Sequence, residues 1–261
     1  MTLCMVWKAR GNIIFLSDSR LTFGIPTSDT GIKVVRIPFN IFEPGSPGQD
    51  PKLILSGDLG MTFAGSSAVA LMMKEALAEV VFQIQGIPNY HDLDMNGISD
   101  LIFRGFKVTA QSIGAAIFEG NLTTVIFAGY CPTENRLRAF RMDVDKSNQC
   151  RINEILLHEG EIETIGSGKK QADAMLPNIP NDRNMVEIMK EVIQDPTVDS
   201  VGGNIQYGSF FGTRFQPYGV IELANNQKGV HYWRGPLDLN GSDFDEDKGL
   251  LPLMPYLDLM K

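Results

Sequence analysis

The sequence is poor in cysteine and histidine, and both shortages narrow the possible classes of protein. Its three cysteines are too few, and odd in number, to build a disulfide scaffold, which favours a reducing compartment. Its three histidines are scattered, at spacings to one another and to the cysteines that suit no metal site. We therefore expect neither a disulfide framework nor a metal centre.

Clustered positive charge and long hydrophobic runs are also missing. The 261 residues include 23 Lys and Arg against 31 Asp and Glu, a net charge of -8, with no basic cluster able to hold a phosphate backbone. No stretch is long enough to span a membrane, and no secretory signal is recognisable at the start. These patterns disfavour nucleic acid and membranes as partners and predict a cytoplasmic protein.

The chain is rich in short β-prone runs joined by turns. Residues 2–8 and 12–17 are the first two, and the turn between them predicts a hairpin. Residues 66–85 are apolar at every third or fourth position after a capping serine, which predicts a helix. Further helices are expected at 98–111, 169–175 and 184–194, and further strands at 32–37, 52–55, 61–64, 115–118, 123–128, 137–142, 152–157, 203–207, 218–223 and 230–233.

The order of these elements predicts the fold class. Strands precede and follow two pairs of helices, and consecutive strands are linked by turns, which is typical of antiparallel sheets. We expect an α+β protein built as a four-layer αββα sandwich, with two antiparallel sheets flanked by helices, over residues 1–235. Residues 236–261 change to an acidic and then Pro- and Leu-rich composition, and are predicted to be an extension that packs on the domain or on a neighbour.

Two motifs that resemble ligand sites fail on their spacing. The run GSGK at 166–169 has neither the earlier glycine nor the following Ser or Thr of a phosphate-binding loop. The acidic run 243–249 has its glycine one place too late for a calcium loop, and its twelfth position is not Glu. We therefore expect no cofactor.

Thr2 is the strongest candidate for chemistry. Removal of Met1 by a housekeeping aminopeptidase, which we expect before so small a residue, would place a free α-amine beside the Thr2 hydroxyl. An α-amine with an unperturbed pKa of about 7.7–8.0 can accept the hydroxyl proton near neutral pH, directly or through one water, without a histidine. Thr is also a common strand residue, so Thr2 alone does not decide between a nucleophile and an ordinary strand start.

The stretch around Thr2 resembles the start of a mature proteasome β-subunit. The segment TLCMVWKARGNIIFLSDSRLTFG contains an N-terminal Thr, a strand, a turn, a second strand, Asp-Ser-Arg, Thr and Gly in that order. Asp18 stands sixteen residues after Thr2, as the catalytic aspartate does in that family. Lys33 in IKVVRI corresponds to the family lysine at the third strand, although it is one residue closer than is typical.

Three later stretches resemble further proteasome segments. AGSS corresponds to the segment that supplies an oxyanion-binding N–H, here that of Gly65, and TIGSG to the segment with a supporting serine, here Ser167. DSVGG corresponds to the start of a late strand, where most active subunits carry an Asp and a Ser in places held here by two valines. Asp199 and Ser200 are shifted by one position, and one of them is expected to orient the amine and a water together with Ser167.

The resemblance covers residues 1–235 and is closest to the bacterial ancestral β-subunits, the Anbu group of N-terminal-nucleophile hydrolases. It implies a threonine peptidase in which Thr2 attacks a peptide carbonyl and forms an acyl-enzyme. Asp18 would hold Lys33, whose charge favours the alkoxide, and Gly65 would bind the oxyanion. The resemblance also implies a substrate channel lined by Leu21, Thr22, Phe63 and Ser67.

Three functions remain open at this point. The first is the threonine peptidase, which would act on peptides or unfolded proteins in a homo-oligomeric ring or open helical ring, with an unfoldase partner unspecified. The second is a catalytically silent structural subunit of such an assembly, in which Met1 blocks Thr2. The third is a small-molecule amidase that uses the same N-terminal chemistry.

Overall fold

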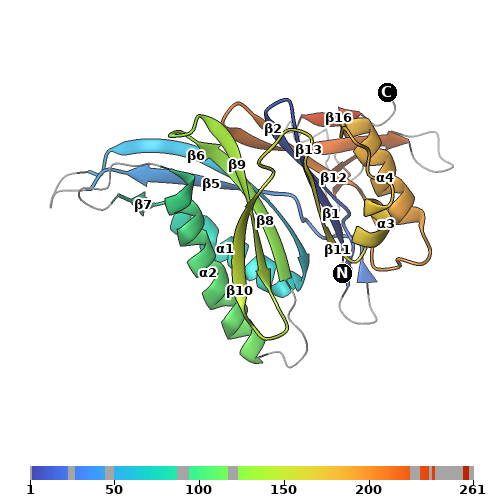
Figure 1. Cartoon of the computed structure of the whole chain (residues 1–261), viewed down its shortest axis with the longest axis horizontal. Helices are drawn as coiled ribbons and strands as arrows, with labels where there is room; N and C mark the ends of the chain where they lie inside the picture. Colours follow the sequence, from blue (N-terminus) through green and yellow to red (C-terminus); the bar gives the residue numbers. More distant parts are fainter. Residues whose placement is uncertain are drawn as a thin grey trace, which may run out of the picture.

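The computed structural model describes residues 2–22, 27–44, 50–86, 94–116, 123–223, 230–234, 237–238 and 255–258. They form a mixed α/β structure in which two large sheets face each other and each sheet carries a pair of helices (Figure 1). No described helix is both long and apolar enough to cross a membrane.

The first sheet has six strands and carries two helices on its outer face (Figure 1). In spatial order its strands are β10 (Cys150–Ile155), β9 (Arg136–Val144), β8 (Thr123–Cys131), β6 (Leu53–Gly65), β5 (Val35–Phe42) and β7 (Ile84–Gln85). All neighbours run antiparallel except β5 and β7, which pair in parallel. The covering helices are α1 (Ser67–Val81) and α2 (Met95–Ala116), and a core of aliphatic, Met and Phe side chains joins them to the sheet.

The second sheet contains the N-terminal hairpin. In spatial order its strands are β11 (Ile162–Gly166), β1 (Leu3–Ala9), β2 (Asn12–Ser17), β12 (Gln206–Phe211), β13 (Arg214–Leu223), β14 (Val230–Arg234) and β15 (Leu237–Asp238). An eighth strand, β16 (Tyr256–Asp258), pairs with β13 in parallel, so described parts of the 236–261 segment join this sheet. The outer face is covered by α3 (Lys169–Asp173) and α4 (Asp182–Gln194). A separate two-stranded sheet, β3 (Leu21–Thr22) with β4 (Thr27–Ser28), follows β2.

β1 is apolar on both faces because it lies between two packed layers. Leu3, Met5 and Trp7 pack with α3 and α4, whereas Cys4 and Val6 pack in the space between the sheets. All five are 0% exposed. Because successive residues of a strand point to opposite faces, a run that is apolar at every position predicts a strand covered on both sides.

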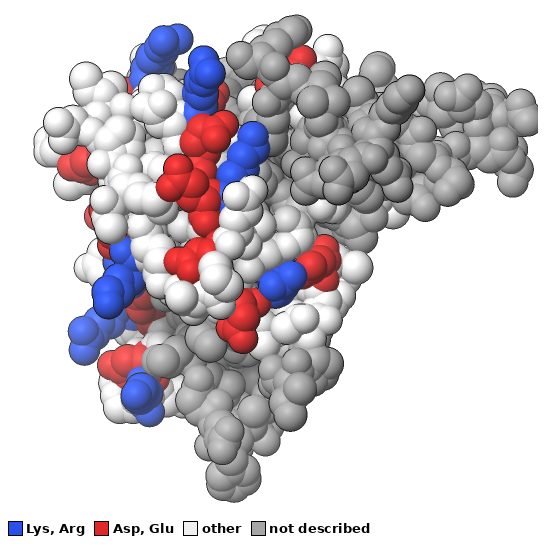
Figure 2. All heavy atoms as spheres, turned by 90° about the vertical axis from the view of Figure 1, so that its right-hand side faces the viewer, with Lys and Arg blue, Asp and Glu red and all other residues white. Residues whose placement is uncertain are grey.

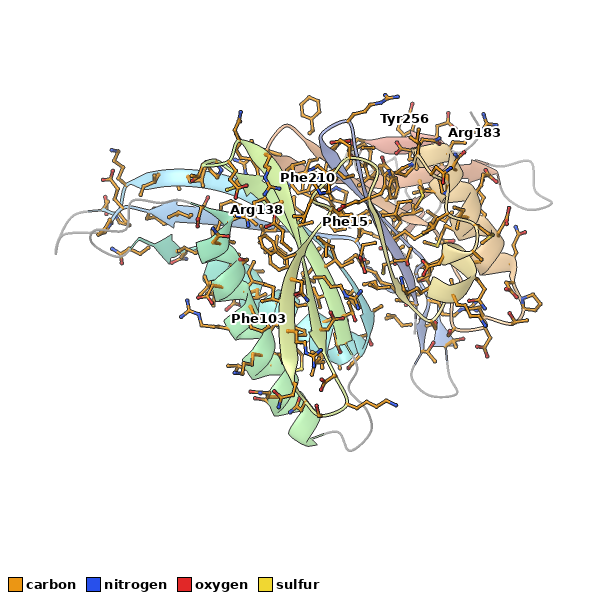
Figure 3. All side chains as sticks on the ribbon, in the orientation of Figure 1. Phe15, Phe103, Arg138, Arg183, Phe210 and Tyr256 are labelled. Carbon is orange, nitrogen blue, oxygen red and sulfur yellow. The ribbon has the colours of Figure 1, made fainter. Side chains whose placement is uncertain are left out.

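Aromatic rings fill much of the space between the sheets. Phe15 and Phe210 project into it (Figure 3), and both meet the ring of Phe215 at steep angles, with centroid distances of 5.2 and 5.1 Å. Edge-to-face pairs of this kind add to the stabilisation from buried area. Gly60 of β6 lies against the same ring, since a Cβ there would be 2.4 Å from a carbon of Phe215. The sheets therefore approach closely at this glycine.

The predicted N-terminal hairpin is confirmed, and its register determines where the candidate site lies. The turn residues at 10–11 have φ values of 55° and 73°, the left-handed conformation that suits a two-residue hairpin turn. The register continues from the turn to Cys4 opposite Ser17. One residue further, the Asp18 N–H donates to a β1 carbonyl at 3.3 Å. Thr2 and Asp18 are consequently neighbours at the same end of the hairpin.

The helix predicted at 66–85 is confirmed as α1, and the Ser66 hydroxyl accepts the Val69 N–H at 3.4 Å as its cap. The helices predicted at 169–175 and 184–194 are α3 and α4. The helix predicted at 98–111 is longer than expected. Residues 115–116 end α2, so the strand predicted there is wrong, and 117–118 lie outside the described residues.

The strand predictions need one correction in the first sheet and one addition in the second sheet. The strands predicted at 52–55 and 61–64 are one continuous strand, β6. Gly57 does not lie in a turn. It allows the ring of Phe39 to pack closely against the β6 backbone, because a Cβ at Gly57 would lie 2.5 Å from that ring. β11 was not predicted, because its sequence IETIG mixes polar and apolar residues and its strand character depends on pairing with β1.

Candidate active site

Thr2, Asp18 and Lys33 meet in the interior at the end of the hairpin. Lys33 Nζ lies 2.8 Å from Asp18 Oδ1 and also donates a hydrogen bond to the Thr2 hydroxyl. The Thr2 hydroxyl donates to the same carboxylate oxygen of Asp18. The three residues are 3%, 0% and 1% exposed, so both charges face each other and the hydroxyl rather than bulk water. This arrangement can polarise the hydroxyl oxygen for nucleophilic attack.

The Asp18 carboxylate is held by main-chain donors as well as by Lys33. Its Oδ1 accepts the Leu3 N–H at 3.0 Å. Its Oδ2 accepts the N–H of Arg20 at 3.1 Å and that of Gly202 at 3.0 Å. Hydrogen bonds from three N–H groups to one ionised carboxylate are charge-assisted and leave it little freedom to rotate. The position of Asp18 beside Thr2 is therefore set by three separate parts of the chain.

Lys33 precedes β5, and a side chain of β12 holds its backbone. The Gln206 Oε1 accepts the N–H of Lys33 at 2.9 Å and that of Val34 at 3.3 Å, and the Gln206 amide donates to the Gly31 carbonyl. Gln206 is 1% exposed. Gln206 was not among the residues predicted from the sequence. The one available signal was a polar side chain at the start of an otherwise apolar strand, NIQYG.

The main chain of Thr2 is held by the turn that follows β11. The Ser167 hydroxyl and the Gly168 N–H each donate to the Thr2 carbonyl oxygen at 3.4 Å. Gly166 has a φ of 102°, and a Cβ at this position would lie 2.0 Å from that same oxygen. The Ser167 and Ser200 hydroxyl oxygens are 2.7 Å apart, which places both predicted serines in one hydrogen-bonded pair next to Thr2.

Asp199 is not brought into this cluster by its side chain. The residue is exposed, and its contact to the site runs through its main-chain carbonyl, which accepts a hydrogen bond from Arg20 Nη1 at 2.8 Å. Val198 is 5% exposed and packs in the core beneath α3 and α4. Of the two shifted candidates, Ser200 is thus the one whose side chain contacts the site.

A cavity of about 10 Å³, roughly the space that one water needs, adjoins Thr2. The predicted channel residues and the predicted oxyanion glycine all line it, together with four others. The lining residues are Thr2, Arg20, Leu21, Thr22, Lys33, Phe63, Ala64, Gly65 and Ser67. Phe63 is 2% exposed and lines the cavity together with its β6 neighbours Ala64 and Gly65. The Thr22 hydroxyl oxygen is buried without a hydrogen-bond partner among the described residues. Thr22 thus brings an unpartnered polar atom to the lining of the cavity.

Cys4 lies close to Thr2 but is not a second nucleophile. Its thiol is 0% exposed and contacts the Phe63 carbonyl at 3.1 Å and the hydroxyls of Ser17 at 3.2 Å and Thr62 at 3.1 Å. Burial raises the pKa of this thiol, which keeps it in the unreactive protonated form. The structure therefore leaves the Thr2 hydroxyl as the nucleophile candidate in this cluster.

Comparison with known proteins agrees with this architecture. No family model and no curated protein matches the sequence. Solved structures do match. The chain has the Anbu fold. The Anbu (ancestral beta-subunit) structure from Yersinia bercovieri superposes with a TM-score of 0.56 at 15% identity, covering 83% of this chain and 86% of that one.

Two further Anbu structures agree with the first. A Gly-1 mutant of Anbu from Hyphomicrobium sp. strain MC1 has a TM-score of 0.54 at 14% identity, covering 83% of this chain and 87% of that one. The helical assembly of the Anbu complex from Pseudomonas aeruginosa has the same TM-score and identity, covering 83% and 86%. At such low identity the likeness establishes the Anbu fold, and the chemistry has to be argued from the residues of this chain.

Proposed function

We propose that this chain is a threonine-type N-terminal-nucleophile peptidase subunit that cleaves peptide bonds after removal of Met1. The observation that carries the proposal is the position of the Thr2 hydroxyl, which is hydrogen-bonded to both members of the buried Lys33–Asp18 ion pair. A strand-start threonine with a structural role alone has no need of two buried charges at its hydroxyl.

The reaction would proceed through an acyl-enzyme. The freed α-amine of Thr2 takes the hydroxyl proton while Oγ attacks the peptide carbonyl carbon, and the Gly65 N–H stabilises the oxyanion that forms. The tetrahedral intermediate collapses by breaking the C–N bond, and the α-ammonium gives its proton to the departing amine. Water, activated by the same α-amine, then hydrolyses the ester. The positive charge of Lys33 favours the alkoxide and lowers the pKa of the neighbouring amine.

The surrounding residues fit supporting roles in that reaction. The Ser167–Ser200 pair would orient the amine and the hydrolytic water, since Ser167 already contacts the Thr2 carbonyl. The unpartnered Thr22 hydroxyl and the β3 backbone would bind an extended peptide as an added strand. Phe63 would limit the size of the residue before the scissile bond, with Leu21 and Ser67 as the other walls.

The finer features of the fold and assembly belong to the same proposal. The three cores, one between the sheets and one beneath each helix pair, support the four-layer αββα sandwich over residues 1–235. The helical assembly named for the Pseudomonas aeruginosa relative supports a homo-oligomeric ring or open helical ring here. Peptides or unfolded proteins in the cytoplasm are the proposed substrates.

A silent structural subunit is the second candidate function. The observation that favours it is the exposed carboxylate of Asp199, because the place of the family aspartate is held by the buried Val198. In that case the Lys33–Asp18 pair would serve the fold alone. The small size of the cavity beside Thr2 would also suit the third function, an amidase that acts on a small acyl group.

Intact mass and covalent labelling separate these functions. In the natively purified chain we expect the loss of one methionine, followed by labelling with a peptide epoxyketone, which bonds to both the hydroxyl and the amine of an N-terminal Thr. Thr2→Ala should abolish labelling, whereas Thr133→Ala, the same change in an exposed turn, should not affect it. Retention of Met1 without labelling identifies the silent subunit, and labelling that survives Thr2→Ala excludes Thr2 as the nucleophile. Peptide and small amide substrates then distinguish peptidase from amidase.

A further inference from the structure

Arg20, which the sequence analysis did not single out, joins three segments around the candidate site. Its Nε and Nη2 donate to the two carboxylate oxygens of Asp29 at 2.6 and 2.9 Å. Its Nη1 donates to the carbonyl oxygen of Asp199 at 2.8 Å and to that of Val201 at 3.4 Å. One guanidinium therefore connects the end of the hairpin, the segment before Lys33 and the loop at 199–202.

The two carbonyls that Arg20 binds flank Ser200. The Ser200 hydroxyl is 2.7 Å from that of Ser167, and the Ser167 hydroxyl contacts the Thr2 carbonyl at 3.4 Å. A continuous series of contacts thus runs from Asp29 through Arg20 to the main chain of Thr2. Fixing the carbonyls on both sides of Ser200 restrains its backbone, and with it the position of its Cβ relative to Thr2.

Main-chain atoms of the 199–204 loop pack against the Arg20 guanidinium. A Cβ at Gly202 would lie 2.3 Å from the Arg20 guanidinium carbon, so the loop lies flat against this group. The Ser19 hydroxyl donates to the Asp29 carbonyl at 2.8 Å and accepts the Asn204 N–H at 2.8 Å. The 199–204 loop is therefore hydrogen-bonded to residues 19–20, which in turn bind Asp29.

The electrostatics keep this pair ionised. Hydrogen bonding to Asp29 raises the pKa of Arg20, and the same bond lowers the pKa of Asp29. The side chains are 25% and 46% exposed. A pair so open to water contributes little to global stability. Its geometry differs from that of a simple surface ion pair. The Arg20 guanidinium binds both oxygens of the Asp29 carboxylate and also two main-chain carbonyls.

We propose that Arg20 and Asp29 form a clamp that positions the Ser200–Ser167 pair against Thr2, in which the Asp29 carboxylate fixes the Arg20 guanidinium. Neither residue touches the reacting atoms, so both are positioning residues. The expected effect on kcat rests on the proposed peptidase function. The effect of the clamp on the 199–204 loop is structural and can be tested without turnover.

The first test is Asp29→Asn in the full-length chain. We expect kcat to fall about tenfold with KM changed less than about twofold, because a misplaced supporting group slows chemistry without weakening substrate binding. Asp29→Glu, which restores the charge, should recover most of kcat. Arg20→Lys keeps a charge opposite Asp29, yet one ammonium cannot also bind both carbonyls, so it should lose kcat like Asp29→Asn. Asp100→Asn breaks the exposed Arg104–Asp100 pair on α2 and is the matched control, with unchanged kcat.

Amide hydrogen exchange at residues 199–204 makes the result independent of activity. We expect faster exchange there in Asp29→Asn, with exchange of the α1 amides and the urea midpoint unchanged. If the wild-type chain shows no turnover, the peptidase proposal fails, and unchanged exchange at 199–204 then overturns the clamp as well. If the wild-type chain does turn over, wild-type kcat in Asp29→Asn overturns the positioning role whatever the exchange shows.

Discussion

Lys33 and Asp18 form an ion pair beyond the reach of bulk water, with Nζ 2.8 Å from Oδ1 and side chains that are 1% and 0% exposed. Taking two charges out of water is costly, so such a pair stabilises a fold only when its geometry is good and the remaining donors and acceptors are satisfied. Main-chain donors from three segments complete the Asp18 carboxylate here. The Thr2 hydroxyl lies within the same network. The stability and the proposed chemistry of the chain consequently depend on the same atoms.

Removing one member of this pair should be strongly destabilising. Asp18→Asn leaves the Lys33 ammonium buried without a counter-charge, and we expect the free energy of unfolding to fall by about 3–5 kcal/mol. Urea denaturation measures this. Glu43→Gln is the control, because the Lys52–Glu43 pair is 76% and 48% exposed and should change stability by less than about 1 kcal/mol. Equal losses in the two variants would mean that Asp18 and Lys33 are not a buried pair.

Gly166 should not tolerate a side chain, for a reason specific to Thr2. Gly166→Ala combines a φ of 102° with a Cβ only 2.0 Å from the Thr2 carbonyl oxygen, so β11 and Thr2 must separate. Gly11→Ala shares the positive φ, at 73°, but its Cβ meets nothing within 4 Å. Gly11→Ala should cost roughly 1–2 kcal/mol of stability.

Gly166→Ala should cost more than that and should also abolish Thr2 labelling by the epoxyketone. Thermal unfolding and labelling, measured together on both glycine variants, provide the comparison. Equal effects of the two substitutions on both readouts would show that the turn after β11 does not hold Thr2.

Phe63 should determine which residue fits before the scissile bond. Phe63→Leu shortens the wall of the small cavity beside Thr2. We expect kcat/KM for a large residue before the cut to rise relative to alanine by about tenfold, since one or two methylenes of pocket space are worth about 1–3 kcal/mol. Phe106→Leu makes the same change in the core beneath α1 and α2 and should leave this ratio unchanged. An unchanged ratio in Phe63→Leu would remove Phe63 from the proposed pocket.

Asp58 should make stability depend on pH. Its side chain is 4% exposed, and burial raises its pKa although Arg36 and Arg214 lie 3.8 and 3.7 Å away. Because the folded pKa exceeds the unfolded value of about 3.9, the native state binds more protons between the two, and stability falls as pH rises through that window.

The neutral variant should lack this loss of stability. Asp58→Asn should therefore become more stable relative to the wild type as the pH is raised from 4 to 7, as measured by urea denaturation. Asp100→Asn, a change at an exposed carboxylate, should show no such trend. A flat difference between Asp58→Asn and wild type across this range would mean that Asp58 is ionised at no cost in the folded chain.

Local patterns predicted the parts of the structure whose partners are close in the sequence. The hairpin over 2–17 needs a turn and two apolar runs, and α1 needs a capping serine and an apolar stripe, so both could be recognised directly. The glycines of β6 show the opposite case. Gly57 resembles a turn signal, yet it serves close contact with the ring of Phe39 on the neighbouring strand.

The sequence by itself determined that Thr2 and Asp18 share one end of a hairpin, because the register from a two-residue turn is a local property. Only the tertiary structure decided what surrounds them. Gln206 orients Lys33, and the Asp29–Arg20 pair holds the Ser200 loop, through contacts between segments up to about 180 residues apart. Such contacts depend on how the two sheets and their loops pack against each other. A local pattern of residues does not predict that packing.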